Sequence, residues 1–171
     1  GSAVAQALRA RGHSVVAAAR SLPDSERSMH VDYMQPCTPA TWAQRLRGAR
    51  IDVVVNAVGI LMPSRTQSFE RVHAQGPIEM FRGAAQAGVK RVVQVSALGV
   101  HEGALHVPYL ATKLRADDAL AALATAADNT GTDDSHADEA RCQGMDHAIV
   151  RPSLVHGPGS DSAALFATLA S

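Results

Sequence analysis

The sequence predicts an α/β fold in which a parallel sheet is covered by helices on both faces. Segments of helical periodicity alternate with short apolar segments, and three of the apolar segments are nearly continuous runs of valine, isoleucine and alanine. Strands buried on both faces of a parallel sheet have this composition. At 171 residues with 46% hydrophobic residues, the chain is long enough for one domain with a real core. We therefore treat residues 1–171 as one domain.

Each element is predicted from its own pattern. In the first helix, Val4, Ala7 and Leu8 form an apolar stripe and Gly12 suits the position just past its end. In the third helix an internal Gly76-Pro77 pair should bend or loosen the chain. Helices are expected over 2–12, 39–49, 68–88, from 108 onward and over 162–170. Strands are expected over 13–20, 29–33, 51–59 with a break at Asn56, and 89–99, and the segment 146–159 is expected to be a strand that leads into a loop. Residues 125–144 are polar, acidic and aperiodic, so we expect an exposed loop there.

Composition excludes several classes of function. The 16 Lys and Arg residues balance 16 Asp and Glu residues, so no overall field favours nucleic acid or an anionic membrane. No apolar run approaches the roughly 20 residues of a membrane span. Cys37 and Cys142 form neither a disulfide framework nor a zinc spacing, which favours a reducing, cytoplasmic compartment. His101 and His106 have no nearby carboxylate pair or cysteine, so no metal site is expected.

One pair of residues carries recognisable chemistry. Tyr109 and Lys113 are four residues apart, and positions i and i+4 share one face of a helix. Pro108 suits the first turn of that helix, because its missing N–H costs nothing there. The pair is either a reactive constellation or a chance match on a surface helix, and the chain contains two residues of each type.

The order of four segments resembles the short-chain dehydrogenase/reductase superfamily. These segments are "VVVNAVG", "VQVSALG", "YLATK" and "AIVRPSLVHGPG", and together they cover nearly the whole chain except 125–144. The resemblance is to the extended and atypical NAD(P)-binding branches. "RVHAQGP" with "AGVKRVVQVSALG" looks most like the subgroup related to the 39-kilodalton accessory subunit of respiratory complex I, in which histidine often stands at the position of His73. The implied fold is a Rossmann-like doubly wound parallel sheet.

The resemblance implies a chain truncated at both ends. Members open with a strand and a GxxGxxG turn, and Gly1 would be the third of those glycines, with the pyrophosphate at the N-terminus of the following helix. The first strand would then be missing. The alternative is that Gly1-Ser2 is a cloning scar. The substrate-capping region of extended members would lie beyond Ser171.

The resemblance also implies a cofactor site. Arg20 ends the second strand of the family, where an acidic residue would bind the ribose of NAD, and a guanidinium there suits the 2′-phosphate of NADP. NADP (NADPH) is therefore favoured and NAD is the alternative. Asp32 resembles the aspartate that contacts adenine, although an ordinary turn residue fits equally well. The remaining expected cofactor residues are Asn56, Ala57, Val58 and Gly59, which match an N-A-x-G turn, and Lys113, Pro152 and Ser153.

Ser96, Tyr109 and Lys113 resemble the catalytic Ser–Tyr–Lys site of the superfamily. Tyr109 would exchange a proton with a carbonyl or alcohol oxygen, and Ser96 would hydrogen-bond that oxygen. A phenol has an ordinary pKa near 10, and the Lys113 ammonium is expected to lower it. Extended enzymes often place the hydroxyl donor slightly later, where this chain has Ala97-Leu98-Gly99.

The expected function is an NAD(P)-dependent oxidoreductase, or a related epimerase or dehydratase, that acts on a small-molecule carbonyl or alcohol. The alternatives are a non-catalytic NADPH-binding sensor or complex-I-type accessory protein, and a truncated product without activity. Family members often form homodimers through the helices that carry the Tyr/Lys pair, which makes a homodimer a further expectation.

Overall fold

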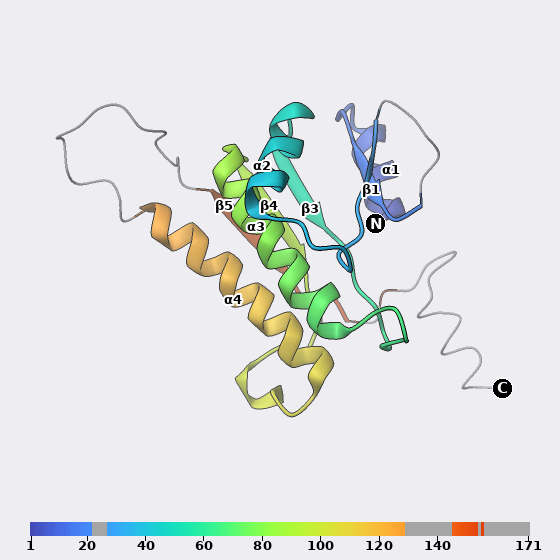
Figure 1. Ribbon diagram of the computed structural model, residues 1–171, viewed down its shortest axis with the longest axis vertical. Helices are drawn as coiled ribbons and strands as arrows, with labels where there is room; N and C mark the ends of the chain where they lie inside the picture. The colour runs from blue at the N-terminus through green and yellow to red at the C-terminus, as the bar shows by residue number, and fades with distance from the viewer. Residues whose placement is uncertain (22–26, 129–144, 154, 156–171) are drawn as a thin grey trace.

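The computed structural model describes residues 1–21, 27–128, 145–153 and 155 (Figure 1). Its elements follow the predicted alternation of helix and strand. In chain order they are α1 (Ser2–Ala10), β1 (Ala17–Ala19), β2 (Ser28–His30), α2 (Pro39–Gly48), β3 (Val53–Asn56), the π-helix η1 (Glu70–Gln75), α3 (Gly76–Ala87), β4 (Arg91–Val95), the short 3₁₀ helix η2 (Glu102–Ala104), α4 (Pro108–Asp128) and β5 (Asp146–Val150).

All strand pairs described are parallel, as the apolar runs predict. β1 pairs with β2, and β3, β4 and β5 form a second sheet in that order. Val53 is paired with Arg91, and Arg91 with Asp146, so the three strands run in register. Because parallel strands end at the same edge, the loops that follow β3, β4 and β5 meet beyond their carboxyl ends, where α/β proteins bind ligands.

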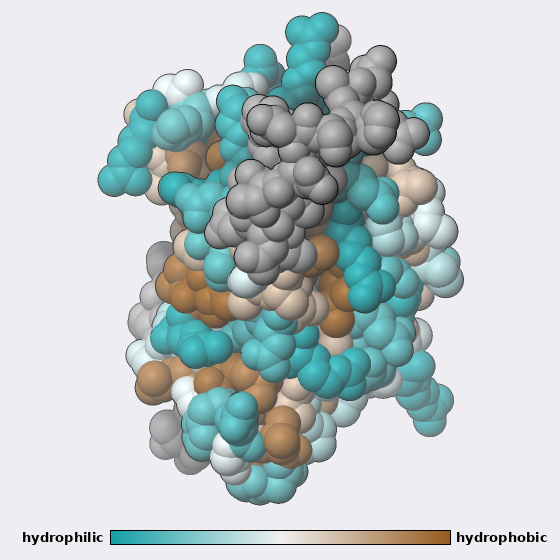
Figure 2. All heavy atoms as spheres, turned by 90° about the vertical axis from the view of Figure 1, so that its left-hand side faces the viewer, coloured by the Kyte–Doolittle hydropathy of each residue, from teal (hydrophilic) through white to brown (hydrophobic). Residues whose placement is uncertain are grey.

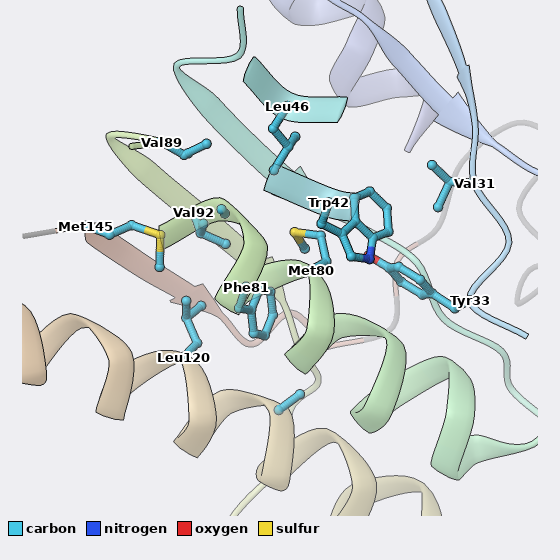
Figure 3. Close-up of a cluster of buried hydrophobic side chains, with 12 residues drawn as sticks. Val31, Tyr33, Trp42, Leu46, Met80, Phe81, Val89, Val92, Leu120 and Met145 are labelled. Atoms are coloured by element: carbon cyan, nitrogen blue, oxygen red, sulfur yellow. The ribbon is translucent and has the colours of Figure 1, made fainter. Parts of the chain in front are cut away.

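The hydrophobic core lies between the three-stranded sheet and helices α2, α3 and α4 (Figure 3). Phe81 of α3 and Leu120 of α4 are fully buried there against Val92 of β4. The opposite face is more open in the described part of the chain, since Val53 and Val150 are 48% and 47% exposed. α1 lies beside β1, away from the other helices (Figure 1), and none of its residues is buried. Its predicted apolar stripe is therefore not covered: Val4 is 40% exposed.

The predicted irregularity at Gly76-Pro77 is confirmed. Pro77 has no N–H to donate to the carbonyl of residue 73, and the turn before it widens into the π-helix η1. Gly76 also allows a close contact, because a Cβ there would lie 2.6 Å from Cγ of Tyr33. The wide turn places His73 on the side that faces α4.

α4 differs from the expectation at its C-terminal end. The helix continues to Asp128, so the predicted loop 125–144 begins at least four residues later than expected. The alanine-rich stretch before it is a good helix former, and this propensity outweighs the polar composition that follows. The rest of that loop and the predicted helix 162–170 lie outside the described residues.

The surface on the α4 side carries hydrophobic residues in separate areas, interrupted by hydrophilic ones (Figure 2). Within the described ranges, no helix combines the length and the apolar character needed to cross a bilayer.

Helices α2 and α3 touch at Gly83, and this contact gives a stability prediction. A Cβ at position 83 would overlap Cβ of Trp42 and lie 2.7 Å from the carbonyl oxygen of Pro39. Alanine gains up to about 1 kcal/mol of helix propensity over glycine, but overpacking against backbone costs about 1–3 kcal/mol. We therefore expect Gly83→Ala to lower the free energy of unfolding in denaturant. Gly48→Ala is the matched control, because a Cβ there meets nothing within 4 Å; equal effects of the two changes would contradict the prediction.

Candidate active and dinucleotide-binding site

Lys113 lies buried at the carboxyl ends of β3 and β4. Its residue is 4% exposed, and its Nζ donates to the carbonyl oxygen of Val95, the last residue of β4, at 3.2 Å. A Cβ on Gly59, in the loop after β3, would lie 3.6 Å from Nζ. Burial lowers the pKa of Lys113, and the nearby Asp117 carboxylate opposes that change. The ammonium therefore sits at the sheet edge where the family site was expected.

Tyr109 lies one helical turn before Lys113, in a cluster of rings. Its ring meets those of Phe69 and His73 edge to face, with centroid distances of 5.7 Å and 5.1 Å. Nζ of Lys113 lies 5.8 Å from the centroid of the Tyr109 ring, on its face. The hydroxyl of Tyr109 has no hydrogen-bond partner among the residues that the structure describes. The predicted pair therefore shares one face of α4 and packs against η1.

The acidity of Tyr109 differs from the sequence-based expectation. Burial raises the pKa of Tyr109, and Lys113 does not counter it. The physical reason is that the ammonium contacts the ring face and the carbonyl of Val95, not the hydroxyl. Tyr109 thus holds its proton at neutral pH, which suits a proton donor.

His73 connects the loop after β3 to α4. Its Nε2 accepts a hydrogen bond from the N–H of Ile60 at 3.0 Å, so in the neutral ring the proton lies on Nδ1, which is 3.4 Å from Oγ1 of Thr112. Burial lowers the pKa of His73 to about 4, and the Lys113 ammonium adds to this. The ring also stacks on Phe69 at 5.2 Å. Sequence reasoning gave His73 no role in the chemistry, whereas the structure places its ring in contact with that of Tyr109 and near enough to Lys113 for the ammonium to lower its pKa.

Ser96 is engaged by a residue that sequence reasoning missed. Its hydroxyl donates to Oδ2 of Asp117 at 2.8 Å, and Arg151 donates to the same oxygen from Nη2 at 3.0 Å. Asp117 is 1% exposed. The spacing could have revealed it, because Asp117 follows Lys113 by four residues and so shares the face of the Tyr/Lys pair.

The N-A-x-G turn after β3 is built around the side chain of Asn56. Its amide donates to Oε1 of Gln94 at 2.7 Å, and its Oδ1 accepts from the hydroxyl of Tyr33 at 3.2 Å. Asn56 is thus buried in the core and shapes the turn through its own hydrogen bonds. Val58 and Gly59 are exposed beyond it, and Gly59 carries no side chain.

The other expected cofactor residues lie at the loops beyond the strand ends or, for Gly1, at a helix start. Arg20 is exposed directly after β1. Asp32 accepts a hydrogen bond from the N–H of Met34 at 2.9 Å, which is the bond of a turn residue. Gly1 precedes α1 as its N-cap. Pro152 follows β5, and its carbonyl accepts from the N–H of Leu98 at 2.8 Å, while Ser153 is exposed.

Comparison with known proteins decides the family. A family model described as NAD(P)H-binding matches residues 1–164. The chain belongs to the NAD(P)H-binding family. This confirms the expected superfamily of NAD(P)-binding proteins. A search of curated proteins found no match.

Solved structures support the same fold for this NAD(P)H-binding chain. "MoeE5 in complex with UDP-glucose and NAD" superposes with a TM-score of 0.72 at 26% identity, over 99% of this chain and 56% of that one. "MoeE5 in complex with UDP-glucuronic acid and NAD" superposes with a TM-score of 0.60 at 23% identity, over 87% of this chain and 48% of that one. The chain therefore spans about half the length of these structures, and the Rossmann-type α/β fold is confirmed.

Proposed function

We propose that this chain is the dinucleotide-binding part of an NAD(P)-dependent oxidoreductase of the short-chain type, or of a related epimerase or dehydratase. The observation that carries the proposal is the buried ammonium of Lys113 at the end of β4, one turn after Tyr109. Burying an ammonium is costly, and such groups concentrate at functional sites. The match to an NAD(P)H-binding family supports NAD(P)H as the ligand.

The residues present fit a bound nicotinamide dinucleotide. Gly59 has no side chain to cover Nζ of Lys113, and the Tyr109 ring stands on the same face of α4. Lys113 would hold ribose hydroxyls, while the loop of Asn56 to Gly59 and the segment of Pro152 and Ser153 would line the nucleotide. When bound, the nicotinamide would give or take the hydride.

Tyr109 would supply the proton in this reaction. Its phenol keeps its proton because burial raises its pKa, so it can donate to a carbonyl oxygen as hydride reaches the carbon. Ser96 would anchor that oxygen only after turning its hydroxyl away from Asp117. The substrate is a small molecule, and UDP-glucose is a reasonable first probe because the MoeE5 structure contains it.

A second candidate is a non-catalytic NADPH-binding protein, closest to the complex-I-related subgroup. Two observations favour it: the pKa of Tyr109 is raised where activation by Lys113 was expected, and the Ser96 hydroxyl is already donated to Asp117. A cytoplasmic homodimer completes either proposal.

The test is calorimetric titration of NADPH and NADH, followed by assay of hydride transfer on UDP-glucose and a panel of aldehydes, ketones and alcohols. Binding with turnover supports the oxidoreductase. Binding without turnover on any member of the panel supports the sensor, and no binding of either dinucleotide overturns both.

Arg20 gives a prediction about cofactor choice. If its guanidinium binds the 2′-phosphate of NADP, Arg20→Asp should weaken NADPH binding about 10- to 100-fold and change NADH binding little. Arg27→Asp is the matched control, because Arg27 precedes β2 and pairs at the opposite end of β1, where its side chain donates to Ser14. Equal loss of NADPH and NADH affinity in Arg20→Asp would refute the assignment of the 2′-phosphate.

A further inference from the structure

The carboxylate of Asp117 links α4 to the ends of β4 and β5, one helical turn after Lys113. It lies in the middle of α4 and is 1% exposed. Its Oδ2 accepts from the Ser96 hydroxyl at 2.8 Å and from Nε and Nη2 of Arg151 at 3.2 Å and 3.0 Å. Ser96 directly follows β4 and Arg151 directly follows β5. One buried oxygen atom thus holds the exits of two strands against α4.

The same region of β4 also holds Lys113. Nζ of Lys113 donates to the carbonyl of Val95, and the next residue, Ser96, donates to Asp117. Lys113 and Asp117 are one helical turn apart on the same face. Val95 and Ser96, two consecutive residues at the end of β4, therefore bind the Lys113 ammonium and the Asp117 carboxylate. A substitution at Asp117 should affect Lys113 in two ways: it changes how the end of β4 is held, and it can remove a nearby negative charge.

We propose that Asp117 is a positioning residue of the Tyr109–Lys113 site. Its carboxylate fixes Ser96 and Arg151 at the strand ends and places a negative charge behind the Lys113 ammonium. The assignment of a site to Tyr109 and Lys113 rests on the proposed function, whereas the link between Asp117 and Lys113 does not.

Two charges and one hydroxyl act on the Asp117 carboxyl. The charges are those of Arg151, in the segment after β5, and Lys113, on the same helix, and the hydroxyl is that of Ser96 at the end of β4. Burial raises the pKa of Asp117 and lowers that of Lys113, and each charge opposes the change in the other. Removing the carboxylate charge leaves burial unopposed at Lys113.

Asp117 also limits what Ser96 can offer a substrate. A serine hydroxyl has one hydrogen, and in this arrangement Asp117 accepts it. Toward the open sheet edge Ser96 then presents only lone pairs, which can accept from an alcohol but cannot donate to a carbonyl. This explains why Ser96 alone is a poor anchor for a carbonyl oxygen.

The experiment measures the ionisation of Lys113 by NMR in protein labelled at the lysine side chains. This sequence contains two lysines, Lys90 and Lys113, and the signal of Lys113 is the one that Lys113→Arg removes. Asp117→Asn keeps an oxygen acceptor for Ser96 but removes the charge. We expect it to lower the pKa of Lys113 by about one unit or more. An unchanged pKa of Lys113 in folded Asp117→Asn would overturn the proposal.

Two further variants make the result specific. Asp118→Asn is the matched control, because Asp118 is the exposed neighbour on the same helix and its change should leave the pKa of Lys113 where it was. If Asp117→Asn does not fold, the pKa of the Asp117 carboxyl is compared between Lys113→Met and the unmutated protein instead. Because coupling is reciprocal, the pKa of Asp117 should rise in Lys113→Met by a similar amount. No rise would overturn the proposal.

Dinucleotide titration of the unmutated protein separates this proposal from the proposed function. A shifted Lys113 pKa in protein that binds no dinucleotide would retain the link and reject the function. Dinucleotide binding with no shift in Asp117→Asn would retain the function and reject the positioning role.

Discussion

Replacing Tyr109 by phenylalanine should reduce turnover about 100- to 10,000-fold while NADPH affinity changes little. The change removes only the hydroxyl, which has no hydrogen-bond partner in the part of the chain that the structure describes. The ring contacts with Phe69 and His73 and the face presented to Lys113 stay in place. The loss should therefore appear in kcat and not in the free energy of unfolding. Steady-state hydride transfer, dinucleotide titration and denaturant unfolding measure the three quantities.

Tyr33, the other tyrosine, is the matched control for this prediction. Its hydroxyl donates to the buried Oδ1 of Asn56 at 3.2 Å. Neither of these residues belongs to α4, which carries the Tyr/Lys pair. Tyr33→Phe should cost about 1–2 kcal/mol of stability, because it removes a buried hydrogen bond, and should leave turnover per folded molecule nearly unchanged. If Tyr109→Phe keeps full turnover, Tyr109 is not the acid, and the non-catalytic candidate gains support.

The strands of the second sheet could be predicted because their composition reflects their burial. Valine-rich runs identify β3 and β4 without any tertiary information, and the parallel pairing follows from the helices between them. Their lengths could be predicted only in part. The break expected at Asn56 is confirmed as the end of β3, but the segment expected over 89–99 pairs regularly only over Arg91–Val95, because the residues just beyond that strand form the loop that carries Ser96.

The Tyr109–Lys113 pair could also be predicted, since its members are close in sequence and a helix fixes their relation. The network around Asp117 could not, because it joins Ser96, Asp117 and Arg151 from three separate elements. Spacing locates a serine at a strand end, but it does not say which way the hydroxyl points. The direction of that single hydrogen bond is what separates a free substrate anchor from a structural link.

Gly83 illustrates the same limit for the fold. Its close approach to Trp42 depends on how α2 crosses α3, and neither helix shows this in its own periodicity. By contrast, the effect of Pro77 is local, since a missing N–H acts on the turn directly before it, and it was predicted correctly.

Protonation of His73 should make the folded state sensitive to mild acid. Burial lowers its pKa to about 4 in the folded protein, against about 6.5 in the unfolded chain. Between these values the unfolded chain binds more protons, so the free energy of unfolding falls as the pH falls. The contribution of neutral His73 to the free energy of unfolding is fully present above about pH 6.5 and is lost progressively toward pH 4. From pH 7 to pH 5 the loss from His73 should be about 2 kcal/mol.

His73→Gln isolates this effect, because glutamine does not titrate and its side-chain oxygen can still accept from the N–H of Ile60. Carboxyl groups contribute equally to both proteins, so the difference between their two pH profiles in denaturant unfolding reports His73 alone. Parallel profiles would mean that the folded protein tolerates a charged His73. Part of the decrease in the pKa of His73 comes from the Lys113 ammonium. In the Lys113→Met background, the difference between the pH profiles with and without His73→Gln should therefore be smaller but still present. The acid sensitivity would then arise mainly from the burial of His73 and in part from the Lys113 ammonium, which we expect to hold the nucleotide.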